Sequence, residues 1–183
     1  FHRFMQHEDT GRMSLQKQIE LDGIDSFFRN VEFYLTGRAP YALEGRLRDT
    51  FGPLFRRYPA EEFFGEPCCP AFVRSWHNHF DNYGNYMPGY CGGISYGDVR
   101  HLDRLLEEGI DPERRPVLSL LMDEDTEGLY ELAAAQGFTE KPDGYYSKCH
   151  LCIELRRFLV NVGDYPELQP KAFYENLTVD ILQ

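Results

Sequence analysis

The sequence predicts a mixed α/β to α+β protein, and three observations lead to this prediction. The first 60 residues contain one strand-like run between two stretches of helical pattern. Residues 67–97 are rich in cysteine, glycine, proline and aromatics, with the alternation expected of a β-hairpin. The residues after these contain amphipathic stretches separated by glycine and proline. We therefore expect β/α material over residues 1–60 and a hairpin-plus-helices domain over residues 61–183.

Residues 1–60 are predicted to form one β/α repeat that is cut short. Ser14 is a suitable N-cap for a helix, residues 31–35 have the pattern of a short strand, and residues 41–55 suit a second helix. The chain begins with Phe1 rather than Met, so we expect it to be a piece of a longer protein. A catalytic motif could then lie upstream of Phe1.

A β-hairpin is predicted directly ahead of Cys91. Side chains alternate from Val73 to Phe80, and the chain then turns at Gly84, which tolerates the positive φ that such a turn needs. The returning strand begins at Asn85 and leads to Cys91. Cys91 is therefore expected just past the end of the hairpin.

A series of helices is predicted after the hairpin. Asp98 caps the first, which Gly109 ends, and two more helices form a packing insertion before residue 138. An amphipathic helix follows over residues 148–162. Arg156 and Arg157 could offset the charge of a metal centre at the cysteines of this helix, but such arginines usually form the wet face. His150 could bond to a sulfur of that centre or face solvent, and it stays unassigned. A short last helix is expected near residues 170–177.

The charge balance argues against two classes of partner. The chain has 19 Lys and Arg against 30 Asp and Glu, a formal charge of -11, which repels nucleic acid phosphates and anionic lipid headgroups. No apolar run approaches the roughly 20 residues needed to cross a bilayer, and we expect no export leader. We therefore expect a cytoplasmic protein that binds neither nucleic acid nor membrane.

Four cysteine positions are predicted to hold one metal centre. Cys149-His-Leu-Cys152 places two thiols one helical turn apart at a predicted helix N-terminus, whose partial positive charge favours thiolates. Cys91 and one member of the Cys68-Cys69 doublet complete a set of four. Such a set suits a [4Fe–4S] cluster.

The doublet leaves one cysteine in reserve. We assign Cys69 as the ligand because it lies nearer the hairpin and is followed by Pro70, which fixes the local chain and lacks a competing N–H. Cys68 is the reserve ligand. The predicted metal ligands are therefore Cys69, Cys91, Cys149 and Cys152.

Structural zinc competes with the cluster, because a Cys₄ zinc site uses the same ligands and the spacing does not separate the two metals. The protein would then be a zinc module that mediates protein interaction. A disulfide framework is disfavoured, since five cysteines in a chain with this much core material are not needed as staples. A thioredoxin-like redox pair is disfavoured because residues 143–148 lack the buried strand that such a motif follows.

A row of polar side chains on the predicted hairpin suggests a second site. His77, His79 and Asp81 are spaced two apart, so on a strand they share one face. They could form a second metal site or a substrate-contacting patch. The alternatives are a solvated hairpin face or histidine side chains bonded to the backbone. Neither a phosphate-binding loop nor a Ser/His/Asp arrangement is present in the sequence.

Together these residues resemble the C-terminal auxiliary-cluster region of radical SAM proteins, the SPASM or shorter twitch type of domain. In that family a cysteine precedes a hairpin with an aspartate–glycine turn, a second cysteine follows, and further cysteines arrive near a helix. The resemblance covers Pro67 to about Val160, where the matching positions are Cys69, Asp81, Gly84, Cys91, Cys149 and Cys152. The chain has too few cysteines for the full SPASM pattern, so the single-cluster, twitch-like version fits better.

The resemblance implies that the main chemistry lies outside this chain. Phe1-His2 and Gly37-Arg38-Ala39 resemble the last β/α units of the partial barrel that precedes such a domain. The barrel would carry a Cys-x₃-Cys-x₂-Cys loop that binds the catalytic cluster and S-adenosylmethionine, and this motif is not in the sequence. The full-length protein would abstract a hydrogen atom from a peptide or small-molecule substrate, with an electron donor as partner. The auxiliary [4Fe–4S] cluster would transfer electrons or anchor substrate, and no catalytic residue is assigned here.

Overall fold

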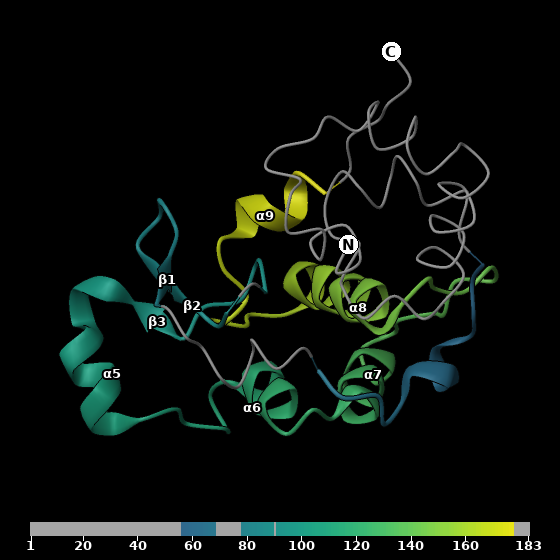
Figure 1. Cartoon of the computed structure of the whole chain (residues 1–183), viewed down its shortest axis with the longest axis horizontal. Coiled ribbons are helices and arrows are strands. Elements are labelled where there is room, and N and C mark those ends of the chain that lie inside the picture. The colour runs from purple at the N-terminus through teal and green to yellow at the C-terminus, as the bar shows by residue number, and fades with distance from the viewer. Residues whose placement is uncertain (1–55, 69–77, 90, 178–183) are drawn as a thin grey trace, which may run out of the picture. The chain divides into compact units, whose positions relative to one another are not determined.

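The computed structural model describes residues 56–68, 78–89 and 91–177. Contacts divide the chain into two units, Phe1–Ala39 and Pro40–Gln183, and every described residue belongs to the second. This part is mixed α+β, with a three-stranded antiparallel sheet and several helices, and it contains no barrel (Figure 1). The β/α repeat predicted for residues 1–60 lies almost wholly outside the described residues and stays a prediction.

The predicted hairpin is confirmed over the described residues, and the part of its first strand predicted over residues 73–77 lies outside them. Strands β1 (His79–Phe80) and β2 (Asn85–Met87) pair antiparallel, with His79 opposite Met87, and Gly84 between them has a φ of 85°. A third strand that the sequence did not predict, β3 (Gly97–Asp98), pairs with β2 on its other side. The resulting sheet has the order β1-β2-β3.

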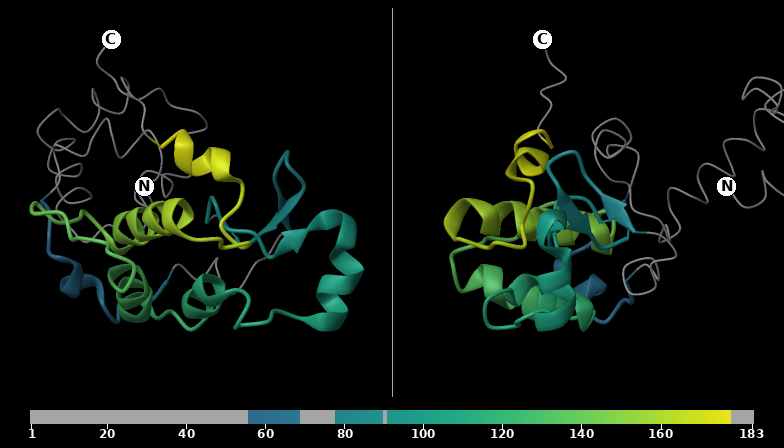
Figure 2. Two further views of the ribbon diagram at one scale, coloured as in Figure 1. Left: turned by 180° about the vertical axis from the view of Figure 1, so that it is seen from behind. Right: turned by 90° about the vertical axis from the view of Figure 1, so that its left-hand side faces the viewer.

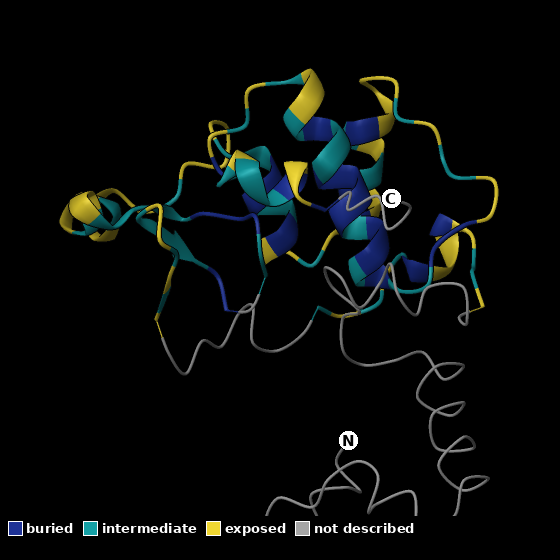
Figure 3. Ribbon diagram, turned by 90° about the horizontal axis from the view of Figure 1, so that it is seen from above, coloured by how far each residue is buried: buried dark blue, intermediate teal, exposed yellow. Residues whose placement is uncertain are grey.

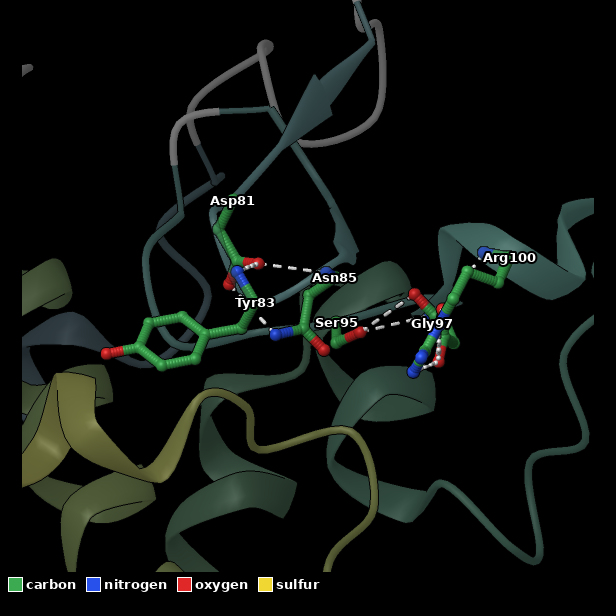
Figure 4. A network of polar contacts seen from close by, with 7 residues as sticks. Asp81, Tyr83, Asn85, Ser95, Gly97 and Arg100 are labelled. Carbon is green, nitrogen blue, oxygen red and sulfur yellow. Dashed lines mark hydrogen bonds and ion pairs between the residues drawn. The ribbon is translucent and has the colours of Figure 1, made fainter.

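The hairpin turn is held by the carboxylate of Asp81 (Figure 4). One oxygen, Oδ1, accepts from the backbone N–H groups of Tyr83 at 2.9 Å and Asn85 at 2.8 Å, and Oδ2 accepts from Asn85 Nδ2 at 2.9 Å. Such local bonds replace the missing ladder bonds at the turn. Asp81 is therefore an integral part of the turn.

Each helix predicted after the hairpin is confirmed. Asp98 accepts a hydrogen bond from the Arg100 N–H at 2.9 Å and so caps a 3₁₀ turn, η3 (Val99–His101), that continues into α5. Gly109, with a φ of 70°, follows the end of α5. The helices are α5 (Leu102–Glu108), α6 (Pro116–Met122), α7 (Thr126–Ala134), α8 (Lys148–Val162) and α9 (Lys171–Glu175), and a further 3₁₀ turn, η2, spans Ala60–Phe63.

The hydrophobic core lies between α8 and the helices α6 and α7. Helix α7 packs against both α6 and α8, and the buried faces are visible in Figure 3. The fully buried leucines of these helices are Leu118, Leu129, Leu151, Leu155 and Leu159. Helix α9 packs against α8 from the side away from α7 (Figures 1 and 2).

A buried carboxylate, that of Glu167, ties the segment before α9 to the rest of the core. Its Oε1 accepts from the N–H groups of Val117 at 2.9 Å and Leu118 at 3.4 Å, at the start of α6. Its backbone carbonyl accepts from the Ser95 N–H at 2.8 Å. Burial raises the pKa of Glu167, because the charged form loses its hydration.

One prediction about α8 is wrong, and one position left open is decided. Arg156, expected on the wet face, has an exposed fraction of 2%. His150, for which facing solvent was one of two alternatives, has an exposed fraction of 3%. The ring of His150 stacks on Tyr146 at 4.7 Å between centroids, and its Nδ1 accepts from the Tyr146 N–H at 3.2 Å. The reason is that α8 is covered on more than one side, which its own sequence pattern does not reveal. Arg157 remains partly exposed.

Within the described residues, no helix is long and apolar enough to cross a membrane.

Candidate metal centre

The cysteine pair of α8 lies at the start of the helix, as predicted. Ser147 is the N-cap, and its hydroxyl oxygen accepts from the His150 N–H at 3.2 Å. Cys149 and Cys152 follow in the first turn and a half, and both are partly buried. The helix N-terminus therefore adds its partial positive charge to the surroundings of both thiols.

The loop Cys91-Gly92-Gly93 runs against α9. A Cβ atom on Gly92 would lie 2.5 Å from Phe173 Cε2, and one on Gly93 would lie 2.4 Å from Phe173 Cδ1. Gly93 also has a φ of 76°, which side chains rarely adopt. The two glycines therefore permit the close approach that fixes Cys91 beside α8 and α9.

Arg156 joins this loop to both helices from a buried position. Its Nη1 donates to the Gly92 carbonyl at 2.8 Å and to the Tyr174 hydroxyl at 3.1 Å, and that hydroxyl donates to the Gly93 carbonyl. The guanidinium also interacts with the side chains of Cys152 and Cys91. One cation thus connects α8, α9 and the Cys91 loop.

The charge of Arg156 is incompletely compensated by the described residues. Its Nε is buried without a hydrogen-bond partner, and no described carboxylate forms an ion pair with it. Burial by itself lowers the pKa of Arg156, but Tyr174, Cys152 and Cys91 together raise that pKa above its usual value. Because leaving a buried cation without an anion is costly, an anionic group bound beside Arg156 would stabilise this position.

Tyr174 is held in its neutral form. Burial raises the pKa of its hydroxyl to about 12, although Arg156 opposes the shift. The phenol is therefore a hydrogen-bonding partner of Arg156 and not its counter-ion. This leaves the thiols of Cys91 and Cys152 as the ionisable groups near the guanidinium that the structure describes.

Cys68, the reserve ligand, lies near Cys152. Its backbone N–H donates to Glu124 Oε2 at 3.2 Å. Burial raises the pKa of its thiol, and the charge of Cys152 adds to this, while charge and a hydrogen bond from Lys148 lower it. Lys148 is itself buried and donates to the Glu66 carbonyl. Cys69, our first choice of ligand, lies outside the described residues.

The described residues fit a thiolate-ligated metal in kind and in charge, but they do not form a complete ligand set. Cys68 interacts with Cys152, and Cys91 and Cys152 share Arg156. No group of three or more His, Cys, Asp or Glu among the described residues is arranged to hold a metal ion. Metal ligation and local folding are coupled in thiolate sites, so a metal bound here would have to draw these cysteines together.

The structure gives a different result for each residue of the predicted polar row. The oxygens of Asp81 hold the hairpin turn through three hydrogen bonds. His79 is partly buried in β1, and His77 lies outside the described residues. The second metal site stays a prediction, and the role of Asp81 in it would require the turn to give up hydrogen bonds.

Arg156 was considered as a residue that could offset cluster charge, but the wet face of the helix was favoured for it, and its burial was not predicted. The signal was its spacing, because residues four apart on a helix share a face, and Arg156 follows Cys152 by four positions. Tyr174 carried no local signal, since it reaches the site only through the packing of α9 on α8.

The chain matches no known protein closely in three comparisons: no family model, no curated protein and no solved structure matches it.

Proposed function

We propose that this chain binds one auxiliary [4Fe–4S] cluster through Cys91, Cys149, Cys152 and one cysteine of the Cys68-Cys69 doublet. The observation that carries the proposal is Arg156, a buried guanidinium beside Cys91 and Cys152 with an unpartnered Nε. Four thiolates around such a cluster give it a net negative charge, which would compensate this cation. The cluster would supply one-electron transfer.

The choice within the doublet is open to test. Cys69 keeps its place as the first assignment because Pro70 fixes the chain after it. The interaction between Cys68 and Cys152 supports Cys68 as the alternative. Binding through Cys68 would remove its thiol proton, and the ammonium of Lys148 would stabilise the resulting thiolate.

The chain would serve a radical SAM enzyme as its C-terminal part. Its cluster would pass electrons or anchor a peptide or small-molecule substrate, while S-adenosylmethionine would bind to the upstream barrel. The hairpin between the doublet and Cys91, together with the Cys-x₂-Cys pair on α8, is the feature that supports this assignment.

Anaerobic reconstitution with iron and sulfide tests the ligand set. The wild-type chain should gain a broad absorbance near roughly 400 nm, whereas Cys149→Ala and Cys152→Ala should bind no iron. Ser119→Ala, a substitution on α6 that removes no thiol, is the control and should load like the wild type. A cysteine variant that keeps full iron would remove that residue from the ligand set.

The doublet provides its own matched pair of variants. Cys69→Ala should lose iron and Cys68→Ala should keep it, and the reverse result would exchange their roles. A colourless wild-type protein that retains zinc through reconstitution would instead establish the structural zinc module.

A further inference from the structure

A second feature is a cavity lined in part by Tyr174, whose hydroxyl donates to the Gly93 carbonyl. This cavity of ≈ 290 Å³ opens between α8 and α9, lined by Arg157, Val160, Asn161, Lys171, Tyr174 and Glu175. Two of these six side chains are cationic and one is anionic. The chain as a whole has a formal charge of -11, so the cavity differs from the rest of the chain in having more cationic than anionic side chains.

The side chains of Arg157 and Lys171 make no hydrogen bond to a carboxylate among the described residues, so both can bind a ligand. The nearest described anion to Arg157 is Glu154, whose Oε1 lies 3.8 Å from Nη1, too far for a hydrogen bond. Glu154 is instead paired with Lys141 at 2.8 Å. Lys171 makes no ion pair or hydrogen bond through its ammonium group within the described residues.

The remaining lining residues shape the kind of ligand that fits. Val160 lines the cavity with an apolar side chain. Tyr174 also lines it, and hydrogen bonds with Arg156 and the Gly93 carbonyl hold its ring in place. The volume suits a small molecule, since ligand pockets begin at about 300 Å³. Guanidinium and ammonium groups together recognise an oxyanion, either carboxylate or phosphate.

We propose that the cavity between α8 and α9 binds a small organic oxyanion, whose carboxylate or phosphate group is held by Arg157 and Lys171. Tyr174 lines this site and bonds to Gly93, so the site adjoins the cysteine loop. Its ligand is therefore placed to be a substrate or effector of the metal centre, a step that rests on the proposed function. Binding of the oxyanion itself requires no metal.

Titration of the metal-free chain with two probes, inorganic phosphate and succinate, tests the site. Chemical shifts of backbone amides in α8 and α9 report binding at this place. The double variant R157Q/K171Q should weaken binding about tenfold or more, because two charge-assisted contacts are lost. The control R104Q/R114Q makes the same change in net charge at exposed positions elsewhere and should bind like the wild type.

Each outcome decides the proposal. Saturable binding of phosphate alone or of succinate alone identifies the group recognised, and binding of both identifies a general oxyanion site. No binding by about 10 mM of either probe, or equal weakening in both double variants, overturns the proposal. Iron loading is measured separately, so a failure of the metal centre leaves this result intact.

Discussion

Helix α8 has two buried faces of opposite character. On one, Leu151, Leu155 and Leu159 are fully buried in the core. On the other, Cys152 and Arg156 meet the Cys91 loop and α9 through polar contacts. The first face is stabilised by removing apolar surface from water, whereas the second buries a cation whose Nε has no partner.

The difference shows which part of the fold is complete by itself. An apolar face needs only complementary packing, which α7 supplies. A buried guanidinium needs an anion, and the described residues offer thiols and a neutral phenol. The leucine face is therefore complete without a ligand, and on the function proposed above the arginine face would gain stability from a bound anionic metal centre.

Leu155→Ala should give the largest loss of stability that does not depend on metal. Removing this fully buried side chain leaves a cavity, at a cost of about 2–5 kcal/mol in the free energy of unfolding. Denaturant unfolding should show the same loss in the metal-free and reconstituted proteins. A loss confined to the reconstituted protein would mean that the leucine face also depends on metal.

Arg156→Met should have an effect that depends on whether the cluster is bound. Without metal, removing the buried cation offsets the loss of its hydrogen bond to Gly92, and the free energy of unfolding should change by no more than about 2 kcal/mol. With the cluster bound, the lost positive charge should lower the reduction potential, because the reduced cluster is more negative.

Redox titration of the reconstituted proteins checks the second part of this expectation. Arg157→Met is the matched control, since it removes an equal charge from the next position, where the side chain is partly exposed. Its potential should shift less. Equal shifts in the two variants would show that Arg156 has no special relation to the cluster.

Glu167→Gln should have the smallest effect, a change in how stability depends on pH. Burial raises the pKa of Glu167 from its usual 4.5, so the folded wild type binds this proton more tightly than the unfolded chain does. Its stability contribution is therefore lost as pH rises above about 4.5 and through the raised pKa.

Glutamine cannot titrate, yet its Oε1 can still accept from Val117 and Leu118. Unfolding free energies measured from pH 4.5 upward should then lack the decline that Glu167 contributes to the wild type. Identical pH profiles would show that another group dominates this range.

The helices were predictable because their ends are set by neighbouring residues. Asp98 and Ser147 cap the helices that follow them, and Gly109 and Gly163 follow the last residues of α5 and α8. Strand β3 was not predictable, because Gly97-Asp98 has no strand pattern of its own. It exists through its pairing with Asn85 and Tyr86.

The candidate site was predictable only in part. The Cys-x₂-Cys pair and Cys91 were found from spacing and from the hairpin. The burial of Arg156 was not, since its partners Gly92 and Tyr174 lie 64 and 18 residues away in sequence. A helix pattern reports one apolar face, and a second face covered by distant segments leaves no trace in it.

The most direct test of the account is a count of iron and acid-labile sulfide in the anaerobically reconstituted wild-type chain. We expect about four of each per chain, together with a rise in unfolding free energy relative to the metal-free protein. A protein that binds no iron, and whose stability is the same with and without reconstitution, would contradict it.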